Sequence, residues 1–151
     1  MDDRPLPYAS DTLEDALTAF RRENGLDAKY AGMSEKAKKL FEQHDIIHVL
    51  FGLSTSVRDE AKADGWTLLG SDVTWVELRT FSELPEEKEI VRDLGWVTIT
   101  RAVLRAIPDY LGMAWRSRRL TKRWRWSDNA PYRKKSVAEI RREFGIDIAL
   151  S

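Results

Sequence analysis

Residues 34–52 read SEKAKKLFEQHDIIHVLFG, and this stretch determines how the rest of the chain is interpreted. Its apolar residues recur at the spacing of one helix face: Ala37, Leu40, Phe41, Ile47 and Phe51. Ser34 is suited to cap this helix, and Gly52 is suited to end it. The two histidines of the chain, His44 and His48, lie four residues apart on the same stripe, so both rings point the same way.

The segments on both sides carry helix signals as well. Asp11 with Glu14 resembles a capping box, which predicts a helix to about Glu23 that Gly25 stops. Downstream, Ser54 or Ser56 can cap a helix that reaches Asp64 and is closed by Gly65. The spacing of Asp72, Trp75, Val76 and Arg79 then favours a helix over residues 66–81.

The second half of the chain continues this pattern. Pro85 is suited to begin a short acidic helix that ends at Gly95, and residues 96–126 predict a helix that Pro108 should break or kink. Residues 127–135 are typical of a loop, and Ser136 with Glu139 forms a capping box for a last helix that Gly145 ends. We therefore expect an all-α fold: a single compact multi-helix domain, with an amino-terminal lead and helix over 1–33 and the motif-bearing part over 34–151.

Composition narrows the classes of function. The 151 residues carry 25 basic and 25 acidic side chains, so no overall field attracts nucleic acid or a membrane. There is no cysteine, which excludes disulfides, cysteine nucleophiles and cysteine-bound metal centres. The first residues include Asp2 and Asp3, whereas signal and transit peptides avoid early acidic residues, so we expect neither. No apolar run approaches the ~18 residues of a membrane-spanning helix. We therefore expect a protein that does not span a membrane, although it could lie on one.

The histidines and nearby carboxylates form a candidate metal site. Two imidazoles with Asp45 and Glu60 are the donor types that a divalent ion needs. In one straight helix Glu60 would lie ~18 Å beyond His48, so the chain must reverse after Gly52 for the two to meet. The alternative is that the histidines are core residues and the carboxylates are only their hydrogen-bond partners, and spacing alone does not choose between the two.

Residues 44–60, HDIIHVLFGLSTSVRDE, resemble the signature of a ubiquinone biosynthesis family, coenzyme Q biosynthesis protein 4. The family pattern is His-Asp-x-x-His, eleven residues, then Glu, which places Glu60 at the expected position. Residues 136–146, SVAEIRREFGI, resemble the family's carboxyl-terminal helix, and the similarity spans roughly residues 34–146. The chain departs from the family at Ile46-Ile47, where a more aromatic pair is usual, and at Ser54, where proline is frequent.

The resemblance implies metal residues His44, Asp45, His48 and Glu60, with zinc as the first choice and iron or manganese as alternatives. It implies a place in ubiquinone (coenzyme Q) synthesis, with decarboxylation and hydroxylation at ring carbon C1 of a polyprenylated precursor. Asp45 would be either the fourth ligand or the catalytic base that orients a water or the substrate carboxylate. The implied partners are an isoprenoid lipid or quinone precursor, the membrane surface, other proteins of the pathway and a second copy in a homodimer. The implied location is cytoplasmic, peripheral on the cytoplasmic face of the membrane. A non-catalytic lipid-binding scaffold is the alternative.

Residues 115–126, WRSRRLTKRWRW, combine six basic side chains with three tryptophans and no acid. A solvated helix end would explain the cations, which suit the negative end of the helix dipole. We favour docking on an anionic membrane surface, where tryptophan lies at the headgroup level. Nucleic-acid binding is the less favoured alternative. The remaining tryptophans, Trp66, Trp75 and Trp96, are expected in the core.

Overall fold

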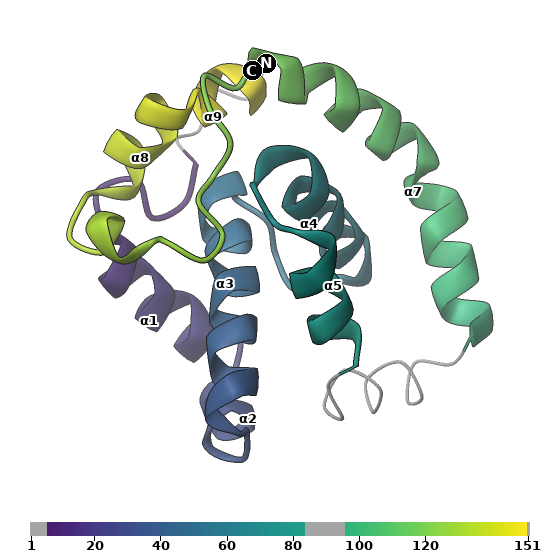
Figure 1. The fold of residues 1–151 in the computed structure, drawn as a ribbon, viewed down its shortest axis with the longest axis horizontal. Coiled ribbons are helices and arrows are strands. Elements are labelled where there is room, and N and C mark those ends of the chain that lie inside the picture. The colour runs from purple at the N-terminus through teal and green to yellow at the C-terminus, as the bar shows by residue number, and fades with distance from the viewer. Residues whose placement is uncertain (1–5, 84–95, 151) are drawn as a thin grey trace.

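The computed structural model describes residues 6–83 and 96–150. Within these ranges the protein is helical and has no β-strand, so the all-α prediction is confirmed (Figure 1). The helices are α1 (Leu13–Glu23), α2 (Asp27–Ala31), α3 (Glu35–Phe51), α4 (Val57–Gly70), α5 (Trp75–Ser82), α7 (Trp96–Arg116), α8 (Val137–Phe144) and α9 (Ile146–Leu150). Two short 3-10 turns, η1 (Ser117–Arg119) and η2 (Ala130–Tyr132), complete the described elements. The predicted helix from Pro85 to Gly95 lies outside the described residues.

Helix α3 is the central element, and α1, α4, α8 and α9 pack around it (Figure 1). Its second half is buried on almost every side rather than along one stripe. The side chains of Ile46, Ile47, Val49 and Leu50 are completely buried. They belong to one core with the inward residues of α1 and α8, so the amino-terminal helix and the motif-bearing part share a single hydrophobic interior.

Both ends of α3 form as predicted. The Ser34 hydroxyl accepts a hydrogen bond from the backbone of Ala37, and Gly52 ends the helix in the left-handed conformation at φ +65°. The last carbonyls of a helix have no partner within it. Here Arg141 of α8 supplies one, since its guanidinium donates to the carbonyls of Leu50 at 2.8 Å and Val49 at 2.7 Å.

Helix α4 is longer than predicted, because Gly65 does not end it. A Cβ atom at this position would lie 2.5 Å from the Cε atom of Met113 and 2.7 Å from the Tyr110 ring, both on α7. Gly65 therefore permits the close approach of α7 rather than the end of α4. The expected continuous helix over residues 66–81 is also wrong: its first part is the end of α4, and α5 starts at Trp75 after a break.

Helix α7 contains Pro108 without ending there, and it follows a curved course (Figure 1). It stops at Arg116, so the prediction of a helix to Trp126 is wrong. The chain beyond it returns to the core, where the Trp124 amide donates to the carbonyl of Gly70 at 2.7 Å. The capping box of Ser136 and Glu139 and the end at Gly145 are confirmed for α8, whereas α1 is capped by Thr12 in place of Asp11.

Candidate metal centre

Helices α3 and α4 run antiparallel, and the turn between them places the candidate ligands face to face. Gly52 reverses the chain, and the hydroxyl of Ser56 accepts a hydrogen bond from the backbone of Asp59 to begin α4. As a result, the Nε2 atom of His48 lies 3.3 Å from the Oε2 atom of Glu60. The reversal after Gly52, which a shared site requires, is present, and it brings Glu60 to the histidines.

One donor atom from each of His44, His48 and Glu60 can be chosen so that all three lie within 4.8 Å of one another, and this group could hold a metal ion. The two imidazole rings meet edge to face, with centroids 4.8 Å apart. Ligands bound tetrahedrally at ~2.0–2.2 Å from zinc lie about 3.4 Å apart. The 3.3 Å separation of His48 and Glu60 matches that spacing, so these two side chains could share a small divalent ion without rearrangement.

The histidine side of the group is buried, and its carboxylate side is open to solvent. The His48 side chain is 2% exposed and its ring stacks on Phe20 of α1, with centroids 5.4 Å apart. Its Nδ1 atom is buried and has no hydrogen-bond partner among the described residues. The Glu60 side chain, by contrast, is 43% exposed. An ion in this position would be held from the protein side by the rings and would face solvent on the carboxylate side.

The charges of the two helices support one another in the metal-free protein. Burial disfavours the charged form of His44, but the hydrogen bond to Asp64 and the charges of Asp64, Glu60 and Asp45 outweigh it and raise the His44 pKa. Burial likewise disfavours the Glu60 carboxylate, but the hydrogen bond from His48 and the nearby histidine charges lower its pKa. The ring–carboxylate pairs therefore hold this group together even without a metal ion.

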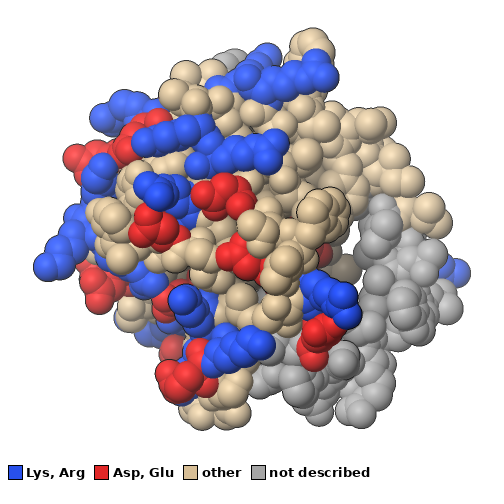
Figure 2. Space-filling model, viewed as in Figure 1, with Lys and Arg blue, Asp and Glu red and all other residues tan. Residues whose placement is uncertain are grey.

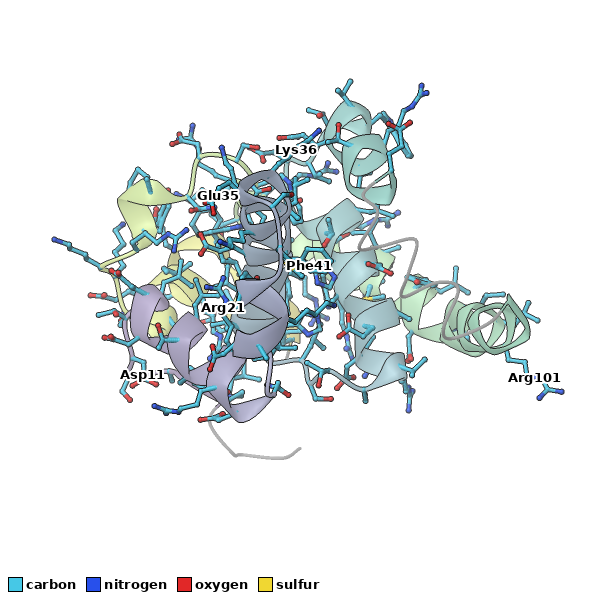
Figure 3. All side chains as sticks on the ribbon, turned by 90° about the horizontal axis from the view of Figure 1, so that it is seen from below. Asp11, Arg21, Glu35, Lys36, Phe41 and Arg101 are labelled. Atoms are coloured by element: carbon cyan, nitrogen blue, oxygen red, sulfur yellow. The ribbon has the colours of Figure 1, made fainter. Side chains whose placement is uncertain are left out.

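The structure does not bring Asp45 into the group. The Asp45 Oδ2 atom accepts hydrogen bonds from the Nε atom of Arg21 at 3.0 Å and from the hydroxyl of Tyr30 at 2.5 Å. Figure 3 shows Arg21 at the boundary between α1 and α3. Arg21 also pairs with Glu42, which in turn binds Arg133 from the loop before α8. Asp45 therefore belongs to a polar network that joins α1, α2 and α3, on a different side of α3 from the histidine pair.

The geometry adds one residue that the sequence interpretation missed. Asp64 lies on α4 one turn after Glu60, and its Oδ1 atom is 3.5 Å from the Nε2 atom of His44. The sequence did hold a signal, because Glu60 and Asp64 have the same i, i+4 spacing as His44 and His48. Only the antiparallel packing of α3 on α4 shows that the two pairs face each other.

The basic–aromatic stretch is not a continuous exposed surface. Its three tryptophans differ, since Trp115 is 63% exposed whereas Trp124 and Trp126 are buried in the core. The expectation that all three lie at a membrane surface is therefore wrong for two of them. Trp66 is buried as predicted, but Trp75 is 82% exposed and does not lie in the core. The Trp96 side chain lies outside what the structure describes.

No described helix combines the length and the apolarity needed to cross a lipid bilayer. Comparison of the chain with protein-family models, with curated proteins and with solved structures found no match.

Proposed function

We propose that the protein binds one divalent metal ion between α3 and α4 through His44, His48 and Glu60, with zinc as the first choice and iron or manganese as alternatives. The observation that carries this proposal is that three donor atoms from two different helices lie within 4.8 Å of one another. Glu60 on α4 follows His48 on α3 by twelve residues in the chain. Two neutral nitrogens and a carboxylate are a donor set that suits all three metals.

The resemblance of residues 44–60 to coenzyme Q biosynthesis protein 4 supports a more specific role. We propose that the protein acts on, or organises the synthesis of, a polyprenylated ring precursor of ubiquinone. A metal ion held here would supply a Lewis acid at a solvent-facing position or, if it were iron, redox chemistry. The exposed Glu60 carboxylate and the histidine rings behind it would together hold the ion.

Elemental analysis tests the metal proposal directly. The purified protein is compared with the His44→Ala/His48→Ala double variant, both before and after incubation with zinc or iron(II). We expect about one metal ion per chain in the wild type and loss of that ion in the variant. Absence of bound metal in the wild type under every condition would overturn the proposal and leave the histidines with a structural role.

The ubiquinone role needs a separate test in cells. In a strain that lacks this gene, we expect a fall in ubiquinone content that a plasmid carrying the wild-type gene restores. A His48→Ala plasmid that restores ubiquinone as well as wild type does would exclude metal-dependent catalysis and favour the scaffold alternative. An unchanged quinone content in the deletion strain would overturn the role in this pathway.

A membrane-facing surface is supported by α7. Four large apolar side chains on this helix are 47–70% exposed at intervals of three and four residues: Leu104, Ile107, Leu111 and Trp115. Figure 2 shows mostly uncharged atoms over this part of the molecule, at the upper right. Arg116, Arg118 and Arg119 follow the stripe directly and are exposed. An apolar stripe that ends in cations suits the surface of an anionic bilayer.

Vesicle flotation tests this surface. We expect the protein to float with vesicles that contain phosphatidylglycerol, to float less with phosphatidylcholine alone, and to lose binding in the Leu111→Glu/Trp115→Glu variant. A steeply salt-dependent affinity for RNA without any vesicle binding would overturn the membrane proposal and favour the nucleic-acid alternative.

A further inference from the structure

Helix α4 presents a second carboxylate to the histidine pair. His44 and His48 are separated by one helical turn on α3, and Glu60 and Asp64 are separated by one turn on α4. Because the helices are antiparallel, His48 meets Glu60 at 3.3 Å and His44 meets Asp64 at 3.5 Å. The two contacts are repeats of one another along the seam between the helices.

From this arrangement we infer that Asp64, and not Asp45, is the fourth protein ligand of the metal site. The inference rests on the metal binding proposed above, and it assigns a residue that lies outside the His-Asp-x-x-His, eleven residues, Glu pattern. The Asp45 carboxylate is committed to Arg21 and Tyr30. The Asp64 side chain is 65% exposed, so it can rotate toward an ion on the carboxylate side without losing buried contacts.

Charge and geometry both favour Asp64. Two neutral imidazoles and two carboxylates balance the charge of a divalent ion, which avoids leaving a net charge beside the buried His48 ring. The 3.5 Å between the Nε2 atom of His44 and the Oδ1 atom of Asp64 is close to the ~3.4 Å expected between two ligands of one tetrahedral ion. The same relation holds for His48 and Glu60. The donor atoms of His44, His48 and Glu60 already lie within 4.8 Å of one another, and Asp64 would join them by rotating its exposed side chain toward the ion.

The set of ligands also determines what the ion can do. Two histidines and two carboxylates would fill the four positions of a tetrahedral zinc ion, so a substrate would have to add a fifth ligand or displace the more exposed carboxylate. Asp64 is the more exposed of the two, at 65% compared with 43% for Glu60. It is therefore the ligand that an incoming carboxylate or phenolate oxygen of a substrate would displace.

The zinc dissociation constant, measured by competition with a chelator, tests this inference. We expect Asp64→Asn to weaken zinc binding by about 100-fold or more, because loss of residues that only support a ligand already costs 10–100-fold. Asp64→Glu should recover most of the affinity. With Co²⁺ in place of zinc, Asp64→Asn should change the visible absorption spectrum, since a bound carboxylate is replaced.

Two charge-matched variants serve as controls. Asp59→Asn removes an acid from the same helix, but its carboxylate is bound to Ser54 and Lys62. Asp45→Asn removes the alternative fourth ligand. Both should bind zinc within about 3-fold of wild type, and thermal unfolding of the metal-free proteins checks that each variant is folded.

The outcomes separate the two proposals. Wild-type affinity in Asp64→Asn, with zinc still lost in His48→Ala, would overturn the role of Asp64 and leave the three-residue site intact. A large loss in Asp45→Asn with none in Asp64→Asn would return the fourth position to Asp45. Failure of the wild type to bind zinc or Co²⁺ at all would overturn the metal site itself.

Discussion

His44 and Asp45 are neighbours in the chain, yet their side chains contact different helices. The Nε2 atom of His44 lies 3.5 Å from the Asp64 carboxylate on α4, whereas the Asp45 carboxylate accepts a hydrogen bond from Arg21 on α1 at 3.0 Å. Consecutive side chains on an α-helix point about 100° apart, so this divergence follows from helix geometry. The motif thus combines two tasks, because its histidines face the candidate metal centre and its aspartate fastens α3 to α1.

The first prediction concerns Asp45→Asn. The amide keeps the size of the side chain but removes the charge that Arg21 and Tyr30 contact. The Asp45 side chain is 6% exposed, so the loss should cost about 2–3 kcal/mol of the free energy of unfolding. Zinc affinity should change little. Urea unfolding of the metal-free protein measures the first effect, and chelator competition measures the second.

Glu42→Gln is the matched comparison for this experiment. Glu42 binds Arg21 and Arg133 in the same network but does not belong to the histidine motif. It should reduce stability in the same direction as Asp45→Asn and leave zinc affinity unchanged. Loss of zinc from Asp45→Asn with normal stability would contradict the structural role of Asp45.

The sequence allowed prediction of those features that depend on local chemistry. Ser34, Ser56 and Ser136 cap helices as expected, and Gly52 and Gly145 end them in the left-handed conformation. Cap positions are predictable because a short polar side chain satisfies backbone groups only a few residues away. The meeting of His48 and Glu60 could be proposed from the sequence, since Gly52 and the short polar turn after it allow the chain to reverse.

What could not be predicted depends on contacts between distant segments. Gly65 is the residue type that usually ends a helix, but its role is set by Tyr110 and Met113 of α7, which lie more than forty residues later in the chain. Trp124 lies in a basic stretch that suggests exposure, yet its backbone pairs with Gly70 and its ring enters the core. The choice between Asp45 and Asp64 likewise depends on which helix packs against which face of α3.

The second prediction concerns the contact of α4 with α7. Gly65→Ala places a methyl group 2.5 Å from the Met113 Cε atom and 2.7 Å from the Tyr110 ring. Overpacking of this kind costs about 1–3 kcal/mol. The better helix propensity of alanine returns at most ~1 kcal/mol, so the net effect is destabilising. Thermal unfolding should therefore show a lower midpoint for this variant.

Gly112→Ala supplies the opposite expectation on α7. A Cβ atom there would have no neighbour within 4 Å, so only the gain in helix propensity remains. This variant should be more stable by about 0.5–1 kcal/mol. Equal effects of the two substitutions would show that α7 does not pack closely on α4 at Gly65.

The third prediction is the pH dependence of the metal-free protein. The His44 pKa is raised above its ordinary 6.5, so its contribution to stability is complete below pH 6.5 and is lost as the pH rises through the folded-state pKa. The Glu60 pKa is lowered from its ordinary 4.5, so its contribution is complete above pH 4.5 and is lost as the pH falls. Both contributions are therefore present between pH 4.5 and 6.5.

Urea unfolding at a series of pH values, with a chelator present, measures this profile. His44→Gln should reduce the decline of stability above pH 6.5, and Glu60→Gln should reduce the decline below pH 4.5. Stabilisation of the protein by zinc should increase as the pH rises, because the metal competes with protons for the histidine rings. The rise in melting temperature on adding zinc should thus be larger at pH 7.5 than at pH 5.5, and a pH-independent rise would contradict zinc binding through the histidines.

The fourth prediction concerns the carboxyl end of α3, one turn after His48. Arg141 is 3% exposed, and burial lowers its pKa to about 10, yet it remains charged at neutral pH and donates to the carbonyls of Val49 and Leu50. Arg141→Met removes both hydrogen bonds and should cost at least about 2 kcal/mol of the free energy of unfolding. Arg141→Lys keeps the charge but not the planar two-armed donor, so its cost should be intermediate.

Arg142→Met, at an exposed position on the same helix, should change stability by no more than about 0.5 kcal/mol. If Arg141→Met and Arg142→Met unfold at the same urea concentration, the contact of α8 with the end of α3 does not stabilise the fold.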